Sequence, residues 1–161
     1  MVACRSWTST TFSTALYPSS SVAPYEVPRL IPPQDPDEYV AMATLPLFHS
    51  FGQTVIQNAT IAHGGCFTLL PRFEPQKAYE ILERDRVSLF AGVPTMYFAL
   101  LHHAQERHYD LSSLKFCFTG GAPMPVEVMG AFEKRFGVTI LEGFGLSETS
   151  PVASFTMFDK P

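Results

Sequence analysis

The sequence predicts an α/β protein, built as a parallel sheet of about five strands with helices packed on it. Two observations support this fold class. Short apolar runs that are typical of buried strands alternate with segments of helical periodicity from residue 39 onward. Proline or glycine also stands at many boundaries between these segments, where it starts or stops a helix. A sheet of this kind binds its ligand beyond the carboxyl ends of its strands.

The individual elements follow from these patterns in chain order. The expected strands are the apolar runs at residues 40–45, 66–70, 88–92, 115–119 and 138–141. The expected helices lie between them, at residues 50–62, 75–84, 94–104 and 125–136. The second helix places Ala78, Ile81 and Leu82 on one face and charged residues on the other. Gly137 is expected to stop the fourth helix.

The first 38 residues differ in composition from the rest of the chain. They hold six of the 14 prolines and many serines and threonines, but no glycine and no periodicity. We therefore expect residues 1–38 to be a disordered leader, and residues 39–161 to form a separate folded unit. The acid-free first 25 residues also fit a transit peptide, but Arg5 is the single cation in them, so disorder is the better interpretation.

Charge and composition narrow the possible partners. The net charge of −4 gives no basic patch, so nucleic acid and anionic membranes are poor candidates. The uncharged spans 40–71 and 87–105 are interrupted by glycine, proline and polar side chains, which favours buried strand-helix units over a membrane span. The three cysteines show no disulfide framework or zinc spacing, and Cys66 and Cys117 lie in apolar runs typical of buried free thiols. We expect a reducing, cytoplasmic compartment.

Four loops at the expected ligand edge carry unusual residues, at 46–52, 92–95, 120–123 and 142–149. In the last of these, Gly143 and Gly145 free the backbone around Phe144, whose ring could stack on a flat ligand. Ser147 could bind a phosphate oxygen, and Glu148 could hold a magnesium ion. A polar loop with an aromatic plug and a solvated acid explains these residues equally well.

The other three loops give weaker signals when taken alone. The two glycines of the Gly-Gly-Ala-Pro loop would let the backbone approach a ligand closely, although a plain strand-to-helix turn is the simpler interpretation. His49 lies among apolar side chains, where a histidine is more often a core residue than a switchable ring at the mouth of a pocket. The Gly92–Val93 turn has the same position after its strand.

In this order, the segments LPLFHSFGQT, GVPTMY, GGAPMP and LEGFGLSETSPV resemble the adenylate-forming (AMP-binding) superfamily, in particular its fatty-acyl-CoA synthetases. The resemblance covers residues 39–161, which would form part of the AMP-binding domain. Enzymes of this family use ATP and Mg²⁺ to convert a carboxylic acid into an acyl-adenylate, and then transfer the acyl group to coenzyme A. The implied partners are thus coenzyme A and a fatty acid or other apolar carboxylic acid, with no nucleic acid and no membrane span.

The resemblance also implies a role for each matching residue. For ATP or AMP, the implied binding residues are Gly120, Gly121, Ala122, Pro123, Gly145 and Phe144, whose ring would stack on adenine where many members have Tyr. For catalysis they are Ser147, which would contact phosphate, Glu148, which would ligate Mg²⁺, and His49, which would lie near the acyl and thiol channels. For the acyl chain they are His49, Gly92 and Val93.

The sequence departs from the family pattern before the LPLFH segment. The family has a glycine-rich phosphate loop ending in Pro-Lys-Gly before the LPLFH segment, whereas the corresponding region here holds no glycine and no lysine. The family's catalytic lysine would follow residue 161. The expectation is therefore a fragment of a fatty-acid–CoA ligase that is inactive alone. The alternative is a non-catalytic remnant or weak adenine-nucleotide-binding module.

Overall fold

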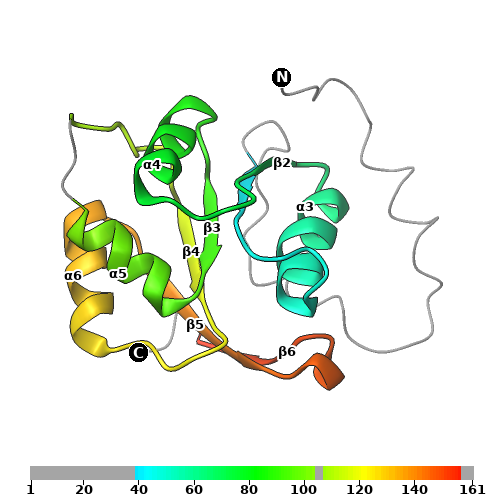
Figure 1. The fold of residues 1–161 in the computed structure, drawn as a ribbon. Helices are drawn as coiled ribbons and strands as arrows, with labels where there is room; N and C mark the ends of the chain where they lie inside the picture. Colours follow the sequence, from blue (N-terminus) through cyan, green and yellow to red (C-terminus); the bar gives the residue numbers. More distant parts are fainter. Residues whose placement is uncertain (1–38, 104–106, 157–161) are drawn as a thin grey trace.

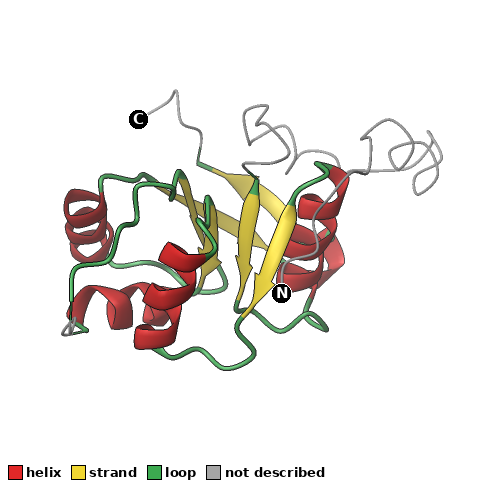
Figure 2. Cartoon of the chain, turned by 90° about the horizontal axis from the view of Figure 1, so that it is seen from above, coloured by secondary structure: helices red, strands yellow, loops and turns green. Residues whose placement is uncertain are grey.

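A computed structural model describes residues 39–103 and 107–156, and every statement below concerns these residues. Its centre is a six-stranded sheet of order β2-β1-β3-β4-β5-β6, with helices on both faces (Figures 1 and 2). In that order, the strands are β2 (Cys66–Leu69), β1 (Val40–Ala43), β3 (Leu89–Gly92), β4 (Phe116–Thr119), β5 (Ile140–Gly145) and β6 (Val152–Phe155). The first five strands run parallel, which confirms the predicted fold class.

The sixth strand, β6, was not predicted. It pairs antiparallel with β5, with Phe144 opposite Ser154. No helix separates the two strands, so β6 falls outside the strand-helix alternation that revealed the others. This pairing also extends β5 to Gly145. Residues 143–145 are therefore strand residues, and the prediction that they belong to a loop is wrong.

The helices follow the predicted order with small shifts at their ends. They are the π-helix η2 (Phe51–Asn58), which continues into α3 (Ala59–Ala62), and α4 (Pro75–Arg84), α5 (Pro94–His102) and α6 (Val126–Phe136). The predicted helix at residues 50–62 is thus present, but most of it is wound with the wider π-type turn. Gly137 ends α6 in the left-handed conformation, with φ of 68°, as its C-terminal position requires.

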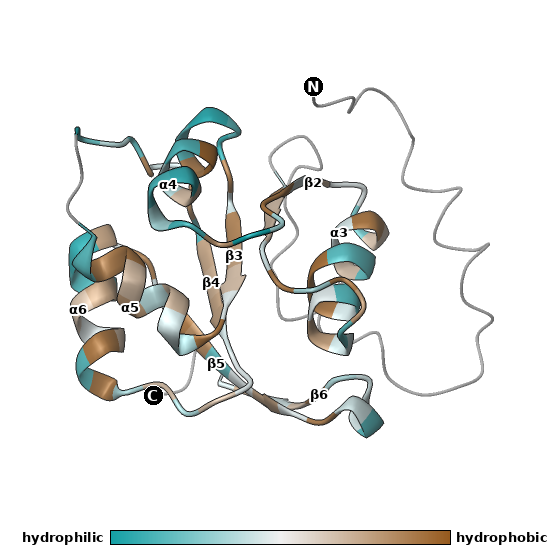
Figure 3. Cartoon of the chain, viewed as in Figure 1, coloured by the Kyte–Doolittle hydropathy of each residue, from teal (hydrophilic) through white to brown (hydrophobic). Residues whose placement is uncertain are grey.

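Alternate side chains of the strands point into two separate hydrophobic cores. Met42, Phe90 and Cys117 face the core beneath α4, α5 and α6. Ala41, Phe116 and Phe118 face the core beneath η2 and α3. The central strands β3 and β4 have hydrophobic colours along their length in Figure 3, as expected for strands that are covered on both sides.

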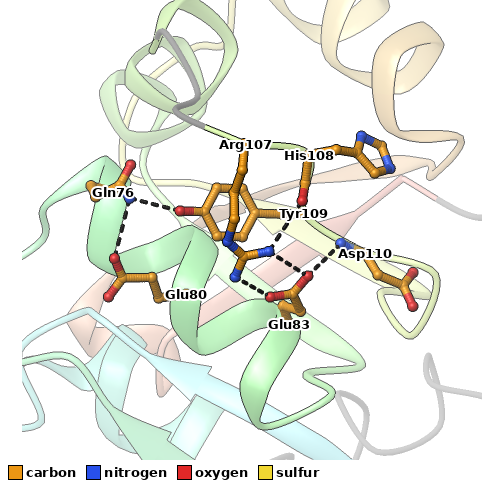
Figure 4. A network of polar contacts seen from close by, with 7 residues as sticks. All are labelled: Gln76, Glu80, Glu83, Arg107, His108, Tyr109 and Asp110. Atoms are coloured by element: carbon orange, nitrogen blue, oxygen red, sulfur yellow. Dashed lines mark hydrogen bonds and ion pairs between the residues drawn. The ribbon is translucent and has the colours of Figure 1, made fainter.

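Polar contacts fasten the segment after α5 to the outer face of α4 (Figure 4). The Glu83 carboxylate forms an ion pair with Arg107 and accepts a hydrogen bond from the backbone N–H of Asp110 at 2.9 Å. The Arg107 hydrogen bond, followed by the Asp110 N–H, lowers the pKa of Glu83 to about 2. Gln76 donates to the Tyr109 hydroxyl at 2.6 Å. Residues 107–110 are therefore held against α4 before the chain enters β4.

Two sequence expectations concern the cysteines and the membrane. Cys117 is a buried free thiol, and burial raises its pKa. Cys66 is disulfide-bonded, so the expectation of a free thiol is wrong for this residue, and its spacing in the sequence gave no sign of a bond. Within the described residues, every helix is too short or too polar to span a bilayer.

Candidate nucleotide site

The carboxyl ends of the parallel strands meet at one edge of the sheet. Gly92, the last residue of β3, is in register with Thr119 at the end of β4, and Thr119 is in register with Glu142 in β5. The segments that follow these strands are therefore neighbours, although they lie far apart in the sequence. The same edge is where a doubly wound sheet binds its ligand.

A cavity of about 270 Å³ opens at this edge. Six of the residues to which the sequence assigned a site role line it: His49, Gly120, Gly121, Phe144, Gly145 and Ser147. The Phe144 side chain is 65% exposed, so its ring face is accessible to a ligand. The volume is near the lower end of the range for small-molecule sites, which suits one flat ring system better than a whole extended ligand.

Five other predicted site residues lie outside the cavity lining. Ala122 and Pro123 are exposed on the loop after β4, and Glu148 is exposed on the turn next to Ser147. Gly92 is buried beneath the edge, where a Cβ atom would come within 2.9 Å of the Phe90 ring. Val93 Cγ1 lies 3.7 Å from where a Cβ would sit on Gly121, so Val93 borders the Gly120–Gly121 wall from the β3 side.

The glycines around Phe144 are required by β6. A Cβ on Gly145 would lie 1.8 Å from the carbonyl oxygen of Pro151, and one on Gly143 would lie 2.7 Å from the Phe155 ring. A side chain at position 145 would therefore require the backbone to move, whereas one at position 143 would require the Phe155 ring to shift. The sequence interpretation, in which these glycines free the backbone to present Phe144, therefore missed a tighter constraint: they let β6 pack against β5.

The loop after β4 is fixed at its far end. The Glu142 carboxylate accepts a hydrogen bond from the backbone N–H of Met124 at 3.0 Å. Met124 is buried, whereas the Gly121–Pro123 stretch before it is exposed. The β5 strand thus holds the loop that forms one wall of the cavity.

Thr119 is a site residue that the sequence analysis missed. It lines the cavity and is fully buried, and its Oγ1 has no hydrogen-bond partner among the described residues. A buried hydroxyl without a partner costs free energy, so a polar group of a ligand would be a favourable addition here. Its place as the last strand residue before Gly120 was the available signal.

Two further segments contribute lining residues. Ser50 and Phe51 belong to the start of η2, and Pro151, Val152 and Phe155 come with β6. Ser50 Oγ lies 3.5 Å from Ser147 Oγ, so the two segments meet across the cavity mouth. No local pattern could have revealed this contact, because 97 positions separate the two serines.

His49 is exposed at the cavity, which excludes the interpretation as a core histidine. Its Nδ1 atom accepts a hydrogen bond from the backbone N–H of Phe51 at 3.1 Å. A neutral imidazole that accepts at Nδ1 carries its proton on Nε2. His49 therefore presents a hydrogen-bond donor with its other ring nitrogen.

The turn from β5 to β6 carries the two groups expected to meet phosphate and metal. Ser147 and Glu148 lie in the short 3-10 helix η3 (Ser147–Thr149). Within the described residues, the Glu148 carboxylate has no hydrogen bond or ion pair, and no group of three or more metal-ligating side chains exists. One free carboxylate fits Mg²⁺, which commonly takes one or two protein carboxylates and completes its shell with water and phosphate oxygens.

Comparison with known proteins decides the family. The model of the family described as AMP-binding enzyme matches residues 10–161. This chain belongs to the AMP-binding enzyme family. The match begins inside the proline-rich leader, so the predicted boundary at residue 38 stays a prediction.

Curated relatives of this AMP-binding family member include CoA ligases of different acids. The chain is 46% identical over 111 residues to the long-chain-fatty-acid–CoA ligase of Bacillus subtilis, a match that covers 69% of this chain and 20% of the relative. It is 36% identical over 111 residues to the feruloyl-CoA synthase of an Amycolatopsis species, covering 69% of this chain and 22% of that protein. The chain thus spans about a fifth of the length of these curated relatives.

Solved structures of the family share the fold. ATP-bound MatB of Rhodopseudomonas palustris superposes with a TM-score of 0.70 at 27% identity, over 78% of this chain and 24% of that protein. O-succinylbenzoate coenzyme A synthetase of Bacillus subtilis, in complex with ATP and magnesium ion, gives a TM-score of 0.64 over 74% of this chain and 24% of its own, at 22% identity. At that identity the second likeness shows the fold alone.

Proposed function

We propose that this chain binds ATP and Mg²⁺ at the edge cavity, as part of an acyl-CoA ligase that forms an acyl-adenylate and then an acyl-CoA. The observation that carries the proposal is the cavity between β4 and β5. Phe144 offers an accessible ring there, and Gly120 and Gly121 line the same cavity without side chains. A flat apolar slot of this kind suits adenine, which binds by stacking and shape.

In this proposal, each group around the adenine slot contacts a different part of the ligands. Ala122 and Pro123 extend the adenine wall, and Gly145 lets the chain turn toward the phosphates. The Ser147 hydroxyl would donate to a phosphate oxygen, and Glu148 would hold Mg²⁺. Bound there, the metal would neutralise phosphate charge. The His49 Nε2–H donor at the mouth would orient the carboxylate or the incoming thiol.

The acyl group is proposed to lie on the β3 side of the cavity, next to Gly92 and Val93. Identity to a long-chain-fatty-acid–CoA ligase supports an apolar carboxylic acid as substrate, and coenzyme A as the acceptor. Identity to a feruloyl-CoA synthase keeps aromatic acids within the same proposal. We also propose a cytoplasmic location and a leader that ends near residue 38.

A second candidate function is a non-catalytic module that binds adenine nucleotide weakly. One observation favours it: within the described residues, no lysine or arginine lines the cavity, so the phosphates would meet no protein cation there. The two candidates share the adenine slot and differ in turnover.

Nucleotide binding tests the proposal common to both. Calorimetric titration of the purified chain with Mg²⁺-ATP should show saturable binding, with GTP as the comparison ligand. Phe144→Ala should weaken ATP binding about tenfold or more, because stacking of a base on an aromatic ring is worth about 1–3 kcal/mol. Phe144→Tyr keeps the ring and is the matched control, with affinity close to that of the parent. Equal affinity of the Ala and Tyr variants would contradict the adenine slot.

A further inference from the structure

One hydroxyl group closes the turn that carries Ser147 and Glu148. Thr149 Oγ1 accepts a hydrogen bond from the backbone N–H of Leu146 at 3.0 Å. It also lies 2.9 Å from the carbonyl oxygens of both Leu146 and Pro151, to which its O–H can donate. The side chain therefore joins the residue before the turn to the residue after it, and both the donor and an acceptor site of the hydroxyl are used.

Two hydrogen bonds between backbone groups also stabilise the turn. The N–H of Thr149 donates to the carbonyl of Leu146 at 3.0 Å, and that of Ser150 donates to Ser147 at 3.2 Å. Ser150 adopts a φ of 62°, a left-handed conformation that a residue other than glycine seldom takes. A turn that contains an unfavourable conformation needs contacts from outside its backbone, and the Thr149 hydroxyl supplies them.

Only part of the turn borders the cavity. Leu146, Ser147 and Pro151 line it, whereas the exposed Glu148 and the half-buried Thr149 lie outside its lining. Phe144, by contrast, is held by the ladder between β5 and β6. Loss of the hydroxyl would thus release the tip of the turn while leaving the adenine slot in place.

We infer that Thr149 is a positioning residue that fixes Glu148 and Ser147 where a Mg²⁺-phosphate group would sit. The inference rests on the proposed nucleotide function. It adds that two parts of the site are held in place by different contacts. The adenine side depends on the sheet, and the phosphate side depends on the Thr149 hydroxyl. Thr149 itself is not among the residues that line the cavity, so it would act through the turn.

A pair of conservative variants tests this separation. Thr149→Val keeps the shape and removes the hydroxyl, whereas Thr149→Ser keeps the hydroxyl. Affinity for ATP is measured with and without Mg²⁺, and affinity for adenosine is measured as a probe of the adenine side alone. Thr149→Val should reduce the gain in ATP affinity from Mg²⁺ about tenfold, the effect expected when one or two hydrogen bonds are lost. Adenosine affinity should stay unchanged, and Thr149→Ser should restore the Mg²⁺ effect.

A second experiment combines Thr149→Val with Glu148→Gln, which removes the charge of the proposed metal ligand. If Thr149 acts through Glu148, the double variant Thr149→Val/Glu148→Gln should lose no more of the Mg²⁺ effect than either single variant. Additive losses would overturn the inference, as would a full Mg²⁺ effect in Thr149→Val. An equal loss of adenosine affinity in Thr149→Val would also overturn it, because that variant would then damage the whole site.

Amide exchange measured by NMR reports on the hydroxyl without any ligand. The Leu146 amide should exchange faster in Thr149→Val than in the parent chain, and at the parent rate in Thr149→Ser. Unchanged exchange in Thr149→Val would overturn the inference.

If the parent chain itself gains no ATP affinity from Mg²⁺, the proposed metal role of Glu148 fails and the functional inference fails with it. A Mg²⁺ effect that survives in Thr149→Val contradicts the inference alone.

Discussion

At the scale of single residues, two threonines near the candidate site have opposite environments. The Thr149 hydroxyl has three hydrogen-bond partners within 3.0 Å. The Thr119 hydroxyl is buried in the cavity wall and has none among the described residues. A bonded hydroxyl stabilises the fold modestly, while an unpaired buried one costs about 1–3 kcal/mol. The same substitution should therefore have opposite effects at the two positions.

Thr119→Val is expected to raise the free energy of unfolding by about 1 kcal/mol in the absence of ligand, because it removes an unsatisfied buried polar atom at nearly constant volume. Thr149→Val is expected to lower it by about 1 kcal/mol. Urea denaturation of the two variants and the parent chain measures both changes. A loss of stability in Thr119→Val as large as that in Thr149→Val would mean that the Thr119 hydroxyl does have a partner.

At the scale of secondary-structure elements, α6 shows two uses of glycine. Gly130 lies inside the helix, and Gly137 follows its last residue in the left-handed conformation. A Cβ atom added at either position would meet no atom within 4 Å, so packing affects neither substitution. The backbone conformation alone distinguishes them. The two sites therefore form a matched pair within one element.

Gly130→Ala should stabilise the protein by about 0.5–1 kcal/mol, since alanine loses less backbone entropy in a helix than glycine does. Gly137→Ala should destabilise it by about 1–2 kcal/mol, because a side chain disfavours the left-handed conformation. Urea unfolding of both variants at one pH checks the prediction. A destabilised Gly130→Ala would be evidence of a packing contact on the exposed side of α6.

At the scale of the whole molecule, the cavity holds few groups for phosphoryl chemistry. Among the described residues that line it, Ser147, Ser50 and Thr119 offer hydroxyls and His49 offers a ring nitrogen, with no lysine or arginine. Transfer at a phosphate depends on cations and donors that stabilise the charge of the transition state. Each missing donor of this kind typically costs about 10²–10³ in rate.

We therefore predict that the 161-residue chain alone forms no measurable acyl-CoA, although it binds ATP. Pyrophosphate release and acyl-CoA formation are measured with Mg²⁺, ATP, coenzyme A and fatty acids of several lengths. Phe144→Ala and Glu148→Ala serve as controls for any background signal. Turnover that disappears in Glu148→Ala would contradict the prediction and would show that phosphate-binding groups lie outside the described cavity.

The sequence by itself determined where the first five strands and the helices between them lie along the chain. Strands that are buried on both faces leave continuous apolar runs in the chain, and amphipathic helices leave a period of 3.6 residues. Pro75, Pro94 and Gly137 mark boundaries through local backbone restrictions. The same local signals drew attention to Gly120, Gly121 and Phe144, because unusual residues after a strand are visible without knowing the fold.

Only the tertiary structure decided which of these residues share a cavity. The antiparallel pairing of β6 leaves no room for a side chain at Gly145, next to the Pro151 carbonyl, and brings the Phe155 ring against Gly143. The meeting of Ser50 with Ser147, and the lack of a partner for the Thr119 hydroxyl, likewise depend on segments brought together by the sheet. Local patterns report how each residue sits in its own element, whereas a cavity is defined by atoms that are close in space and distant along the chain.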